Sequence, residues 1–463
     1  MNNLHRHPLG RTGLAVVAFV CASLMGLSAA WASGLYLPGH GTRPMGRGGT
    51  GTVSAMDMNA LWHNPSLLAG IRGHHLMVDL TLVNQSMTFE REPRVYPSGE
   101  VRSYGAVSNE AYATVIPQLG FASDFGTDRF VFGVGVYGPN GVRSRYPQDG
   151  PQRYVLIDNE DSLLVFTELA AAFRVTDWLW LGGGIQNVGA SVRTVNVQSA
   201  YAGVFGDPED RDLDMLFQAK LESWLNITGN FGVWVEPVKR FQAGLSVQLP
   251  VEFQDDDLEY ELRLPSHPYF DEAEISEKGK VSAGFKLPTV IRAGVRYVED
   301  DWDLELNVVH ERWSTNQELV ADPKGTEISG IYAVGTIEAR PLDIPLKYQD
   351  TWSVRLGGDV KVLESLTLRA GALYEQSAVP EETLSVFIVD TDKISASVGG
   401  SVALTKELEL DFGYAHIFYL GGDVDDSEVT QINSSNPEGA LVVGNGRYDV
   451  SANMLGVGLR AGW

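Results

Sequence analysis

The sequence predicts an all-β fold, a transmembrane antiparallel β-barrel of about 14 strands, and three observations point to it. The chain of 463 residues begins with an export signal, alternates apolar and polar side chains over long segments, and ends on an amphipathic strand with an aromatic last residue. Strands that cross lipid must pair all their backbone groups with one another, so they close into a barrel. The expected location is the outer membrane of a Gram-negative cell.

Residues 1–32 have the pattern of a removable secretory signal: a positive start, an apolar run and an Ala30-Trp31-Ala32 cleavage site. The apolar run is too short to span a bilayer as a helix. The exported chain should therefore begin at Ser33. It then contains no thiol and no disulfide, because Cys21 lies inside the apolar run.

The clearest alternation runs from Trp352 to Val362. Apolar residues such as Val354 and Leu356 share one face and Arg355 shares the other, because successive side chains of a strand point to opposite faces. Similar patterns predict strands that start near residues 76, 113, 129, 163, 179, 217, 240, 283, 302, 350, 366, 394, 408 and 449. The long polar gaps 139–160, 199–216, 254–280, 314–345, 379–392 and 421–446 are expected to be extracellular loops, and the short turns to face the periplasm.

Aromatic residues gather where the expected strands end, which suits the two interfacial girdles of a membrane barrel and separates it from a soluble β-sandwich. They include Trp178, Trp180, Trp224, Trp234, Tyr297, Trp302, Trp313, Trp352, Phe418 and Tyr419. In the last strand, apolar residues from Leu455 to Trp463 alternate with glycines and Arg460. This end resembles the C-terminal signal of bacterial outer-membrane barrels.

The formal net charge of −24 makes nucleic acid an unexpected partner, because its phosphates would be repelled. Beyond the signal, no apolar stretch is long enough for a membrane-spanning helix. Acidic clusters at 207–214, 255–257 and 423–428 leave two readings open. They are solvated loops, or they bind divalent cations that bridge to outer-membrane lipid and lipopolysaccharide.

The segment from Ser33 to His75 does not alternate and should be compact coil with one short helix. Residues 54–57 fit a helix start, and Asn64-Pro65 ends the helix, because a residue before proline avoids helical angles. The segment is either a periplasmic tail or a plug inside the barrel. Residues 46–51 match G-x-G-x-x-G, but without a βαβ unit this pattern does not indicate nucleotide binding.

The stretch Gly46-Arg47-Gly48-Gly49-Thr50-Gly51 is followed by Asn64-Pro65-Ser66, and residues 133–141 read GVGVYGPNG. These motifs, with residues 347–358 (KYQDTWSVRLGG) and the end from Gly446, resemble the FadL/TodX (OMPP1) family of outer-membrane transporters for long-chain fatty acids and hydrocarbons. Ser66 stands where that family usually has alanine. The resemblance spans nearly the whole exported chain.

The resemblance implies a signal peptide (1–32), an N-terminal hatch that plugs the lumen (33–75) and the barrel (76–463). It implies passive uptake of a hydrophobic small molecule, a fatty acid or a hydrocarbon, with lateral release into the bilayer where the third strand kinks. The implied hatch and gating residues are Gly46, Arg47, Gly48, Asn64, Pro65 and Ser66. The implied kink residues are Gly133, Gly135, Gly138 and Pro139, since glycine and proline weaken strand pairing. Tight packing against the hatch is the alternative role for these glycines.

Four arginines on inward faces are candidate contacts for a ligand carboxylate: Arg292, Arg296, Arg355 and Arg369. Acids such as Glu305, Asp359, Glu375 and Asp411 share those faces, so mutual neutralisation or anchoring of the hatch is the alternative. We expect a monomer without metal, cofactor or catalytic residues, since His74 and His75 point to opposite faces and no nucleophile motif is present. A hydrophilic diffusion porin and a surface adhesin or receptor on the same barrel remain alternative functions.

Overall fold

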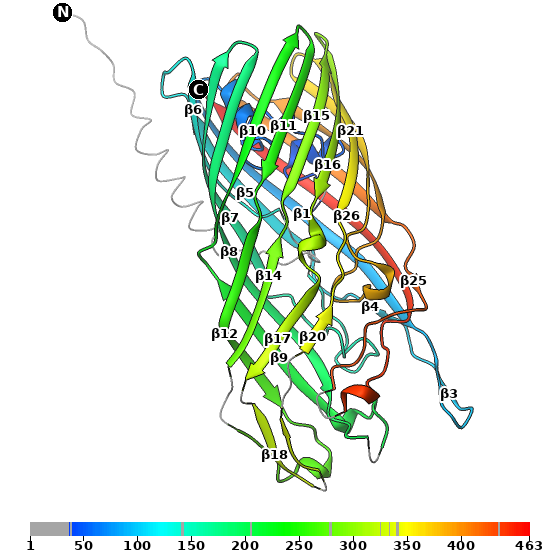
Figure 1. The fold of residues 1–463 in the computed structure, drawn as a ribbon. Helices are drawn as coiled ribbons and strands as arrows, with labels where there is room; N and C mark the ends of the chain where they lie inside the picture. The colour runs from blue at the N-terminus through cyan, green and yellow to red at the C-terminus, as the bar shows by residue number, and fades with distance from the viewer. Residues whose placement is uncertain are drawn as a thin grey trace, which may run out of the picture.

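In the computed structural model the chain forms one tall barrel, with helices inside its upper half and irregular loops at its lower end (Figure 1). The structure describes residues 37, 39–139, 143–203, 206–276, 280–324, 326–332, 334–338, 342–433 and 436–463. The expected signal peptide, residues 1–32, lies outside this range. Among the described residues, no helix has the length and apolar character needed to cross a membrane.

The wall is a closed antiparallel barrel of 14 strands, which confirms the expected fold class. Its continuous strands are β1 (His74–Arg91), β5 (Thr114–Ser123), β6 (Phe130–Tyr137), β7 (Leu163–Thr176), β8 (Leu179–Ser199), β22 (Leu366–Glu375), β23 (Lys393–Ala403), β24 (Leu408–Tyr419) and β26 (Gly446–Gly462). Each remaining position around the wall holds two shorter elements in succession: β9 (Asp214–Ser223) and β10 (Ile227–Val238), β11 (Phe241–Gln248) and β12 (Val251–Arg263), β14 (Lys280–Leu287) and β15 (Val290–Val298), β16 (Trp302–Glu311) and β17 (Glu318–Lys324), β20 (Leu342–Pro345) and β21 (Thr351–Leu363).

The barrel closes where the first and last strands of its wall meet. Strands β1 and β26 pair along their whole length, from His75 opposite Gly462 to Arg91 opposite Gly446. Short turns connect the strands at the upper end in Figure 1, and long connections gather at the lower end. Short turns face the periplasm in such barrels, so the lower end is extracellular.

The alternation in the sequence places apolar side chains outside and polar ones inside. In β21, Val354 is 47% and Leu356 46% exposed, whereas Arg355 and Asp359 are buried. A lipid-facing apolar surface and a polar lumen are typical of an outer-membrane barrel.

Two of the expected loops are wrong. The gap 254–280 begins inside β12, which continues to Arg263 and contains the acidic run Asp255-Asp256-Asp257. The gap 314–345 contains β17, β20 and the hairpin β18 (Glu327–Ile331) and β19 (Gly335–Glu338). The outward face of β12 carries Glu252, Asp257 and Glu259, which made this strand end look like a loop.

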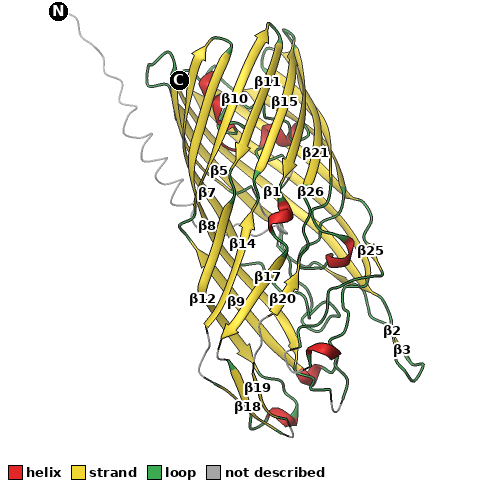
Figure 2. Cartoon of the chain, in the orientation of Figure 1, coloured by secondary structure: helices red, strands yellow, loops and turns green. Residues whose placement is uncertain are grey.

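Smaller elements decorate the extracellular end (Figure 2). A hairpin of β2 (Arg94–Val95) and β3 (Val101–Arg102) projects from the end of β1. The other short strands are β4 (Val107–Ser108), β13 (Glu274–Ile275) and β25 (Asp423–Val424). The short 3-10 helices there are η2 (Arg211–Leu213), η3 (Pro268–Phe270), η5 (Glu381–Thr383) and η6 (Pro437–Gly439), whereas η4 (Trp313–Thr315) lies between β16 and β17 along the wall.

Residues 39–72, here called the inner segment, lie inside the barrel near its periplasmic end (Figure 1). The inner segment contains α2 (Thr42–Gly46), α3 (Ala60–His63) and the 3-10 helix η1 (Pro65–Gly70). The expected helix does end at Asn64, but it begins at Ala60 and not after residues 54–57. Instead of a regular first turn, the side chain of Asp57 accepts a hydrogen bond from the Asn59 backbone.

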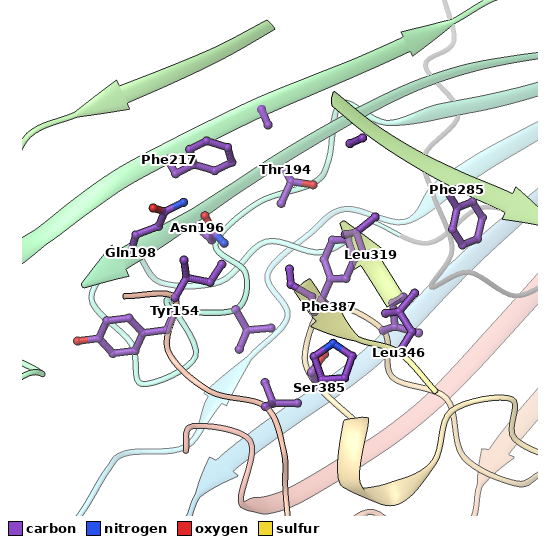
Figure 3. Close-up of a pocket in the computed structure, with 18 of the residues that line it drawn as sticks. Tyr154, Thr194, Asn196, Gln198, Phe217, Phe285, Leu319, Leu346, Ser385 and Phe387 are labelled. Carbon is purple, nitrogen blue, oxygen red and sulfur yellow. The ribbon is translucent and has the colours of Figure 1, made fainter. Parts of the chain in front are cut away.

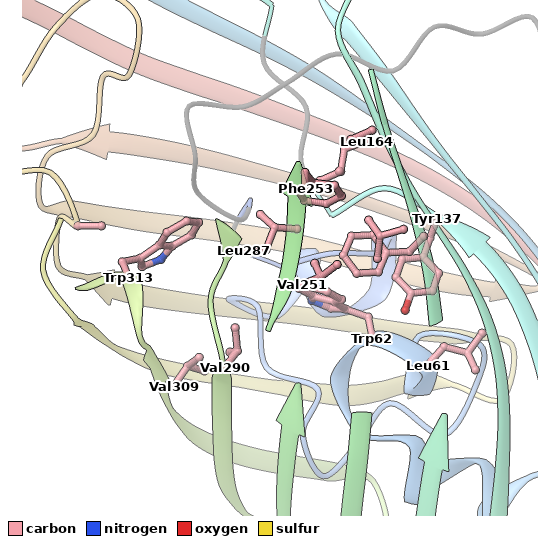
Figure 4. Close-up of a cluster of buried hydrophobic side chains, with 14 of the residues drawn as sticks. Leu61, Trp62, Tyr137, Leu164, Val251, Phe253, Leu287, Val290, Val309 and Trp313 are labelled. Atoms are coloured by element: carbon pink, nitrogen blue, oxygen red, sulfur yellow. The ribbon is translucent and has the colours of Figure 1, made fainter. Parts of the chain in front are cut away.

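Apolar side chains of the inner segment join a core that continues along the lumen (Figure 4). Leu61 and Trp62 of α3 lie beside Tyr137 of β6, and Phe253 of β12 belongs to the same cluster. The ring of Trp62 packs edge-on against Tyr137, with centroids 6.2 Å apart. This core therefore connects the inner segment to the third strand of the wall.

Candidate functional site

The glycine-rich turn of the inner segment is anchored to the wall through Arg47. The Arg47 guanidinium lies 2.6 Å from Asp303, 3.4 Å from Glu305 and 3.1 Å from Asp359, and its side chain is 3% exposed. Neighbouring Gly48 donates its backbone N–H to Ser397 Oγ at 2.8 Å. A single guanidinium thus neutralises carboxylates from two separate strands, β16 and β21.

The turn approaches the wall so closely that side chains are excluded on both sides. Gly48 has a φ of 69°, and a Cβ there would lie 2.6 Å from the Ala372 nitrogen. A Cβ on Gly357 or Gly371 of the wall would overlap the Arg47 backbone. Glycine is required at Gly48 because both its backbone conformation and this contact exclude a side chain.

A second anchor is the Asn64-Pro65-Ser66 motif. Asn64 Nδ2 donates to the carbonyl oxygens of Thr52 at 2.9 Å and Val233 at 3.2 Å. Its Oδ1 accepts from the Ser66 hydroxyl at 2.6 Å and caps η1 by accepting from the Ser66 backbone. Asn64 is fully buried, so one side chain ties two parts of the inner segment to β10.

A third anchor holds the beginning of the inner segment. Arg43 lies 2.6 Å from Asp57, and the hydroxyl of Thr42 donates to Asp79 of β1 at 2.6 Å. Burial alone would raise the pKa of Asp57, but Arg43 and Arg460 lower it to about 2. The carboxylate therefore stays ionised and paired at neutral pH.

The four arginines proposed as ligand contacts all lie in the lumen beside the inner segment. Arg355 is 3.1 Å from Glu375, and Arg296 is 2.9 Å from Asp303. Arg369 lies between Asp359 at 3.5 Å and Asp411 at 3.6 Å, while Arg292 covers the Trp62 ring at 4.5 Å. These contacts favour the alternative role, in which the arginines neutralise acids and hold the inner segment.

Strand β6 is the short third strand. Its pairing with β5 extends only from Ser123 opposite Phe132 to Leu119 opposite Val136. Gly133 and Gly135 face the inner segment, where a Cβ would meet Leu68 and Leu61. This contact matches the packing alternative for these two glycines.

Beyond β6, Gly138 and Pro139 border a small void of about 10 Å³ together with β1 and β5. The Leu37 backbone donates to the Pro139 carbonyl at 3.0 Å, so the start of the described chain bonds to the end of the third strand. Both polar atoms of the Gln118 side chain are buried here and have no hydrogen-bond partner among the described residues. The wall is thus incompletely paired where β6 ends.

A buried polar network holds the last residue of β6. The hydroxyl of Tyr137 donates to Glu168 of β7. Gln186 of β8 donates to the same carboxylate at 2.8 Å and in turn accepts from Gln248 of β11 at 2.6 Å. Tyr137 lies in the 133–141 motif, but nothing in the sequence pattern singled out Glu168, Gln186 or Gln248, because each lies alone on a different strand.

Sequence reasoning missed an apolar cavity of about 580 Å³ in the extracellular half of the barrel (Figure 3). Phe217, Phe253, Phe285, Leu319 and Phe387 contribute to its lining. The lining is drawn from residues between 154 and 440, so it is scattered over most of the barrel.

One wall of this cavity is polar but uncharged. Thr194, Asn196 and Gln198 lie at alternate positions of β8 and point toward the cavity (Figure 3). Among the described lining residues, Glu428 is the single acidic or basic side chain. Its carboxylate lies 2.6 Å from Lys347.

Three acids of the cluster at 207–214 are paired with arginines, namely Asp207, Glu209 and Asp214. Glu209 lies 2.5 Å from Arg91 and 3.1 Å from Arg94, and Arg153 pairs with Asp214 at 2.6 Å. Burial would raise the pKa of Glu209, but Arg91 and the Tyr104 hydroxyl lower it. The charges of Asp207, Glu209 and Asp214 are therefore neutralised within the protein.

A closed barrel with an anchored inner segment and an apolar cavity defines an outer-membrane transport barrel. A family model described as outer membrane protein transport protein (OMPP1/FadL/TodX) matches residues 23–462, and the chain belongs to this family. Outer membrane protein P1 of Haemophilus influenzae is 23% identical over 405 residues, which cover 80% of this chain and 83% of that relative. The long-chain fatty acid transport protein of Escherichia coli K12 is 25% identical over 125 residues, 27% of this chain and 25% of that one.

Solved structures share the fold. A Pseudomonas aeruginosa FadL homologue superimposes with a TM-score of 0.74 at 19% identity, over 94% of this chain and 100% of that one. The Ralstonia pickettii toluene transporter TbuX gives a TM-score of 0.62 at 16% identity, over 92% and 99%. The family and the barrel place this protein in the outer membrane.

Proposed function

We propose that this protein mediates passive uptake of hydrophobic small molecules across the outer membrane. The observation that carries the proposal is the apolar cavity of about 580 Å³, which lies in the lumen on the extracellular side of the inner segment. Relatives named for long-chain fatty acids and for toluene support a hydrophobic substrate class. The inner segment acts as the plug that keeps hydrophilic solutes out.

Transfer of such a solute needs no energy source. Each CH₂ group moved from water to apolar surroundings gains about 0.8 kcal/mol, so the overall transfer of such a solute from water to lipid is favourable. The protein only has to bypass the charged outer leaflet.

Release is lateral, through the wall where β6 ends. Support comes from the short β5–β6 ladder, the void beside Gly138 and Pro139, and the unpaired Gln118 side chain. A solute leaving here enters the bilayer directly and avoids the aqueous periplasm.

Uptake is tested in cells that produce or lack the protein, with radiolabelled oleate, dodecanol and toluene, and with sucrose as the hydrophilic solute. Faster entry of at least one hydrophobic solute and unchanged sucrose entry are expected. Ala219→Trp fills part of the cavity and should slow uptake, whereas Val238→Trp on the exposed periplasmic end of β10 should not. Equal uptake with and without the protein would contradict the proposal.

Lateral release is tested by a disulfide cross-link between β5 and the residue that follows β6. The register that pairs Leu119 with Val136 places Pro117 opposite Gly138, so the pair Pro117→Cys and Gly138→Cys extends the seam by a disulfide. Oxidised protein should lose uptake and the same protein should regain it on reduction, which makes the reduced form the matched control. Unchanged uptake in the oxidised form would exclude this exit.

A further inference from the structure

The polar stripe on β8 contains an unused hydrogen-bond acceptor. Asn196 is 7% exposed, lines the cavity, and its Oδ1 accepts no hydrogen bond from any described residue. Thr194 and Gln198 flank it on the same face of β8 (Figure 3). An unpaired buried carbonyl oxygen costs free energy that a ligand N–H or O–H group recovers.

A second unused polar atom lies elsewhere in the lining. The Tyr348 side chain is 2% exposed, and its hydroxyl has no partner among the described residues. A hydroxyl both donates and accepts, whereas an amide oxygen only accepts. The cavity therefore offers hydrogen bonds to a ligand that can itself donate.

Positive charge is missing from the described lining of the cavity, which contains no lysine, arginine or histidine. The described cationic side chains next in sequence to lining residues are already paired: Lys347 with Glu428 at 2.6 Å, Arg153 with Asp214 at 2.6 Å, Arg193 with Asp158 at 2.6 Å, Lys220 with Glu222 at 2.6 Å and Lys286 with Glu252 at 3.1 Å. A carboxylate is a poor ligand here, because a buried anion needs a cation or several donors and cannot donate to Asn196 Oδ1.

We propose that the cavity binds uncharged amphiphiles that carry one hydroxyl group on an apolar body, such as long-chain alcohols, in preference to carboxylates. The apolar wall takes the hydrocarbon chain, and the hydroxyl donates to Asn196 Oδ1. This inference rests on the proposed uptake function and specifies its substrate class.

The test compares three probes of equal chain length on the full barrel in lipid nanodiscs at pH 8, where dodecanoate is ionised. Competition of dodecanol, dodecanoate and dodecane against radiolabelled dodecanol gives the three affinities. Dodecanol should bind about tenfold more tightly than either of the others, the effect of one good hydrogen bond. Equal or tighter binding of dodecanoate would overturn the inference and leave uptake standing. Binding of none of the three would instead remove the proposed function.

Asn196→Leu separates the hydrogen bond from the cavity itself. This variant should lose the advantage of dodecanol over dodecane and keep dodecane binding, which also reports that the cavity still forms. Gln254→Leu, the matched amide-to-leucine change on the outward face of β12, should behave as the unaltered protein. A full dodecanol advantage in Asn196→Leu would refute the assigned role.

Discussion

Replacing Arg47 by methionine should release the inner segment from the wall while the barrel stays intact. The guanidinium lies within 3.4 Å of Asp303, Glu305 and Asp359, all of them buried. Arg47→Met keeps much of the side-chain volume and leaves three carboxylates without their shared partner. The repulsion and desolvation that follow are relieved when the inner segment moves away and water enters.

The free-energy cost of Arg47→Met depends on the ion pairs that remain after the substitution. Removing one partner of a buried ion pair costs about 3–5 kcal/mol. Arg296 still lies 2.9 Å from Asp303, and Arg369 lies 3.5 Å from Asp359, so the lower end of this range applies. Since 1.4 kcal/mol is a factor of about ten, the ratio of docked to undocked inner segment should fall roughly 100-fold.

Hydrogen–deuterium exchange measures this ratio. Amides of residues 48–53 should exchange roughly 100-fold faster in Arg47→Met, because their opening free energy falls by that amount. The β1–β26 ladder serves as an internal reference and should be unchanged. Arg240→Met is the matched control, since Arg240 pairs with Glu299 on an exposed turn. Equal exchange of residues 48–53 in both variants would refute the reasoning, and faster exchange of the ladder would mean that the whole barrel is destabilised.

Three further predictions concern the same segment. Burial lowers the pKa of His40 and of His63 to about 3, so both bind protons only when undocked. Docking should weaken by about 1.4 kcal/mol per histidine and pH unit as pH falls from 6.5 toward 3. After the measured rates are divided by the intrinsic exchange rate at each pH, residues 39–72 should be less protected at pH 5 than at pH 7, and equal protection would contradict the prediction. Deleting residues 39–72 should raise single-channel conductance in planar bilayers, and unchanged conductance would mean that they do not plug the lumen. Asn64→Ala removes bonds to Thr52 and Val233 and should speed exchange of η1 about tenfold or more. Asn64→Asp should speed it further, because it buries a carboxylate oxygen against the two carbonyl oxygens, and full protection of η1 in both variants would contradict this role.

Alternation alone was enough to predict the barrel and nearly every strand start, because a membrane wall imposes opposite polarity on its two faces. The predicted starts at 163, 179, 302, 366 and 408 coincide with β7, β8, β16, β22 and β24. The pattern fails beyond the hydrocarbon layer. There the outward face of β12 carries Glu252, Asp257 and Glu259, so a strand that leaves the lipid looks like a loop.

The site was harder to predict. Arg47 and Asn64 stand in recognisable local motifs, and the sequence singled them out. The cavity has no motif, because Phe217, Phe285 and Phe387 come together only when distant strands and loops close over the lumen. The inward arginines show the limit of sequence reasoning most clearly. The alternation shows that Arg355 faces the lumen, but it does not show that Arg355 is already paired with Glu375.

Neighbouring strands of the wall are paired over unequal lengths, and this has a mechanical consequence. The pairing between β1 and β26 runs the full length of both strands, whereas the pairing between β5 and β6 ends after the Leu119 and Val136 pair. A closed β-barrel that is stretched from inside separates first between the two strands whose pairing is shortest. Any solute that stretches this barrel should therefore concentrate the deformation in the β5–β6 seam, while the rest of the wall remains stiff enough to keep its shape.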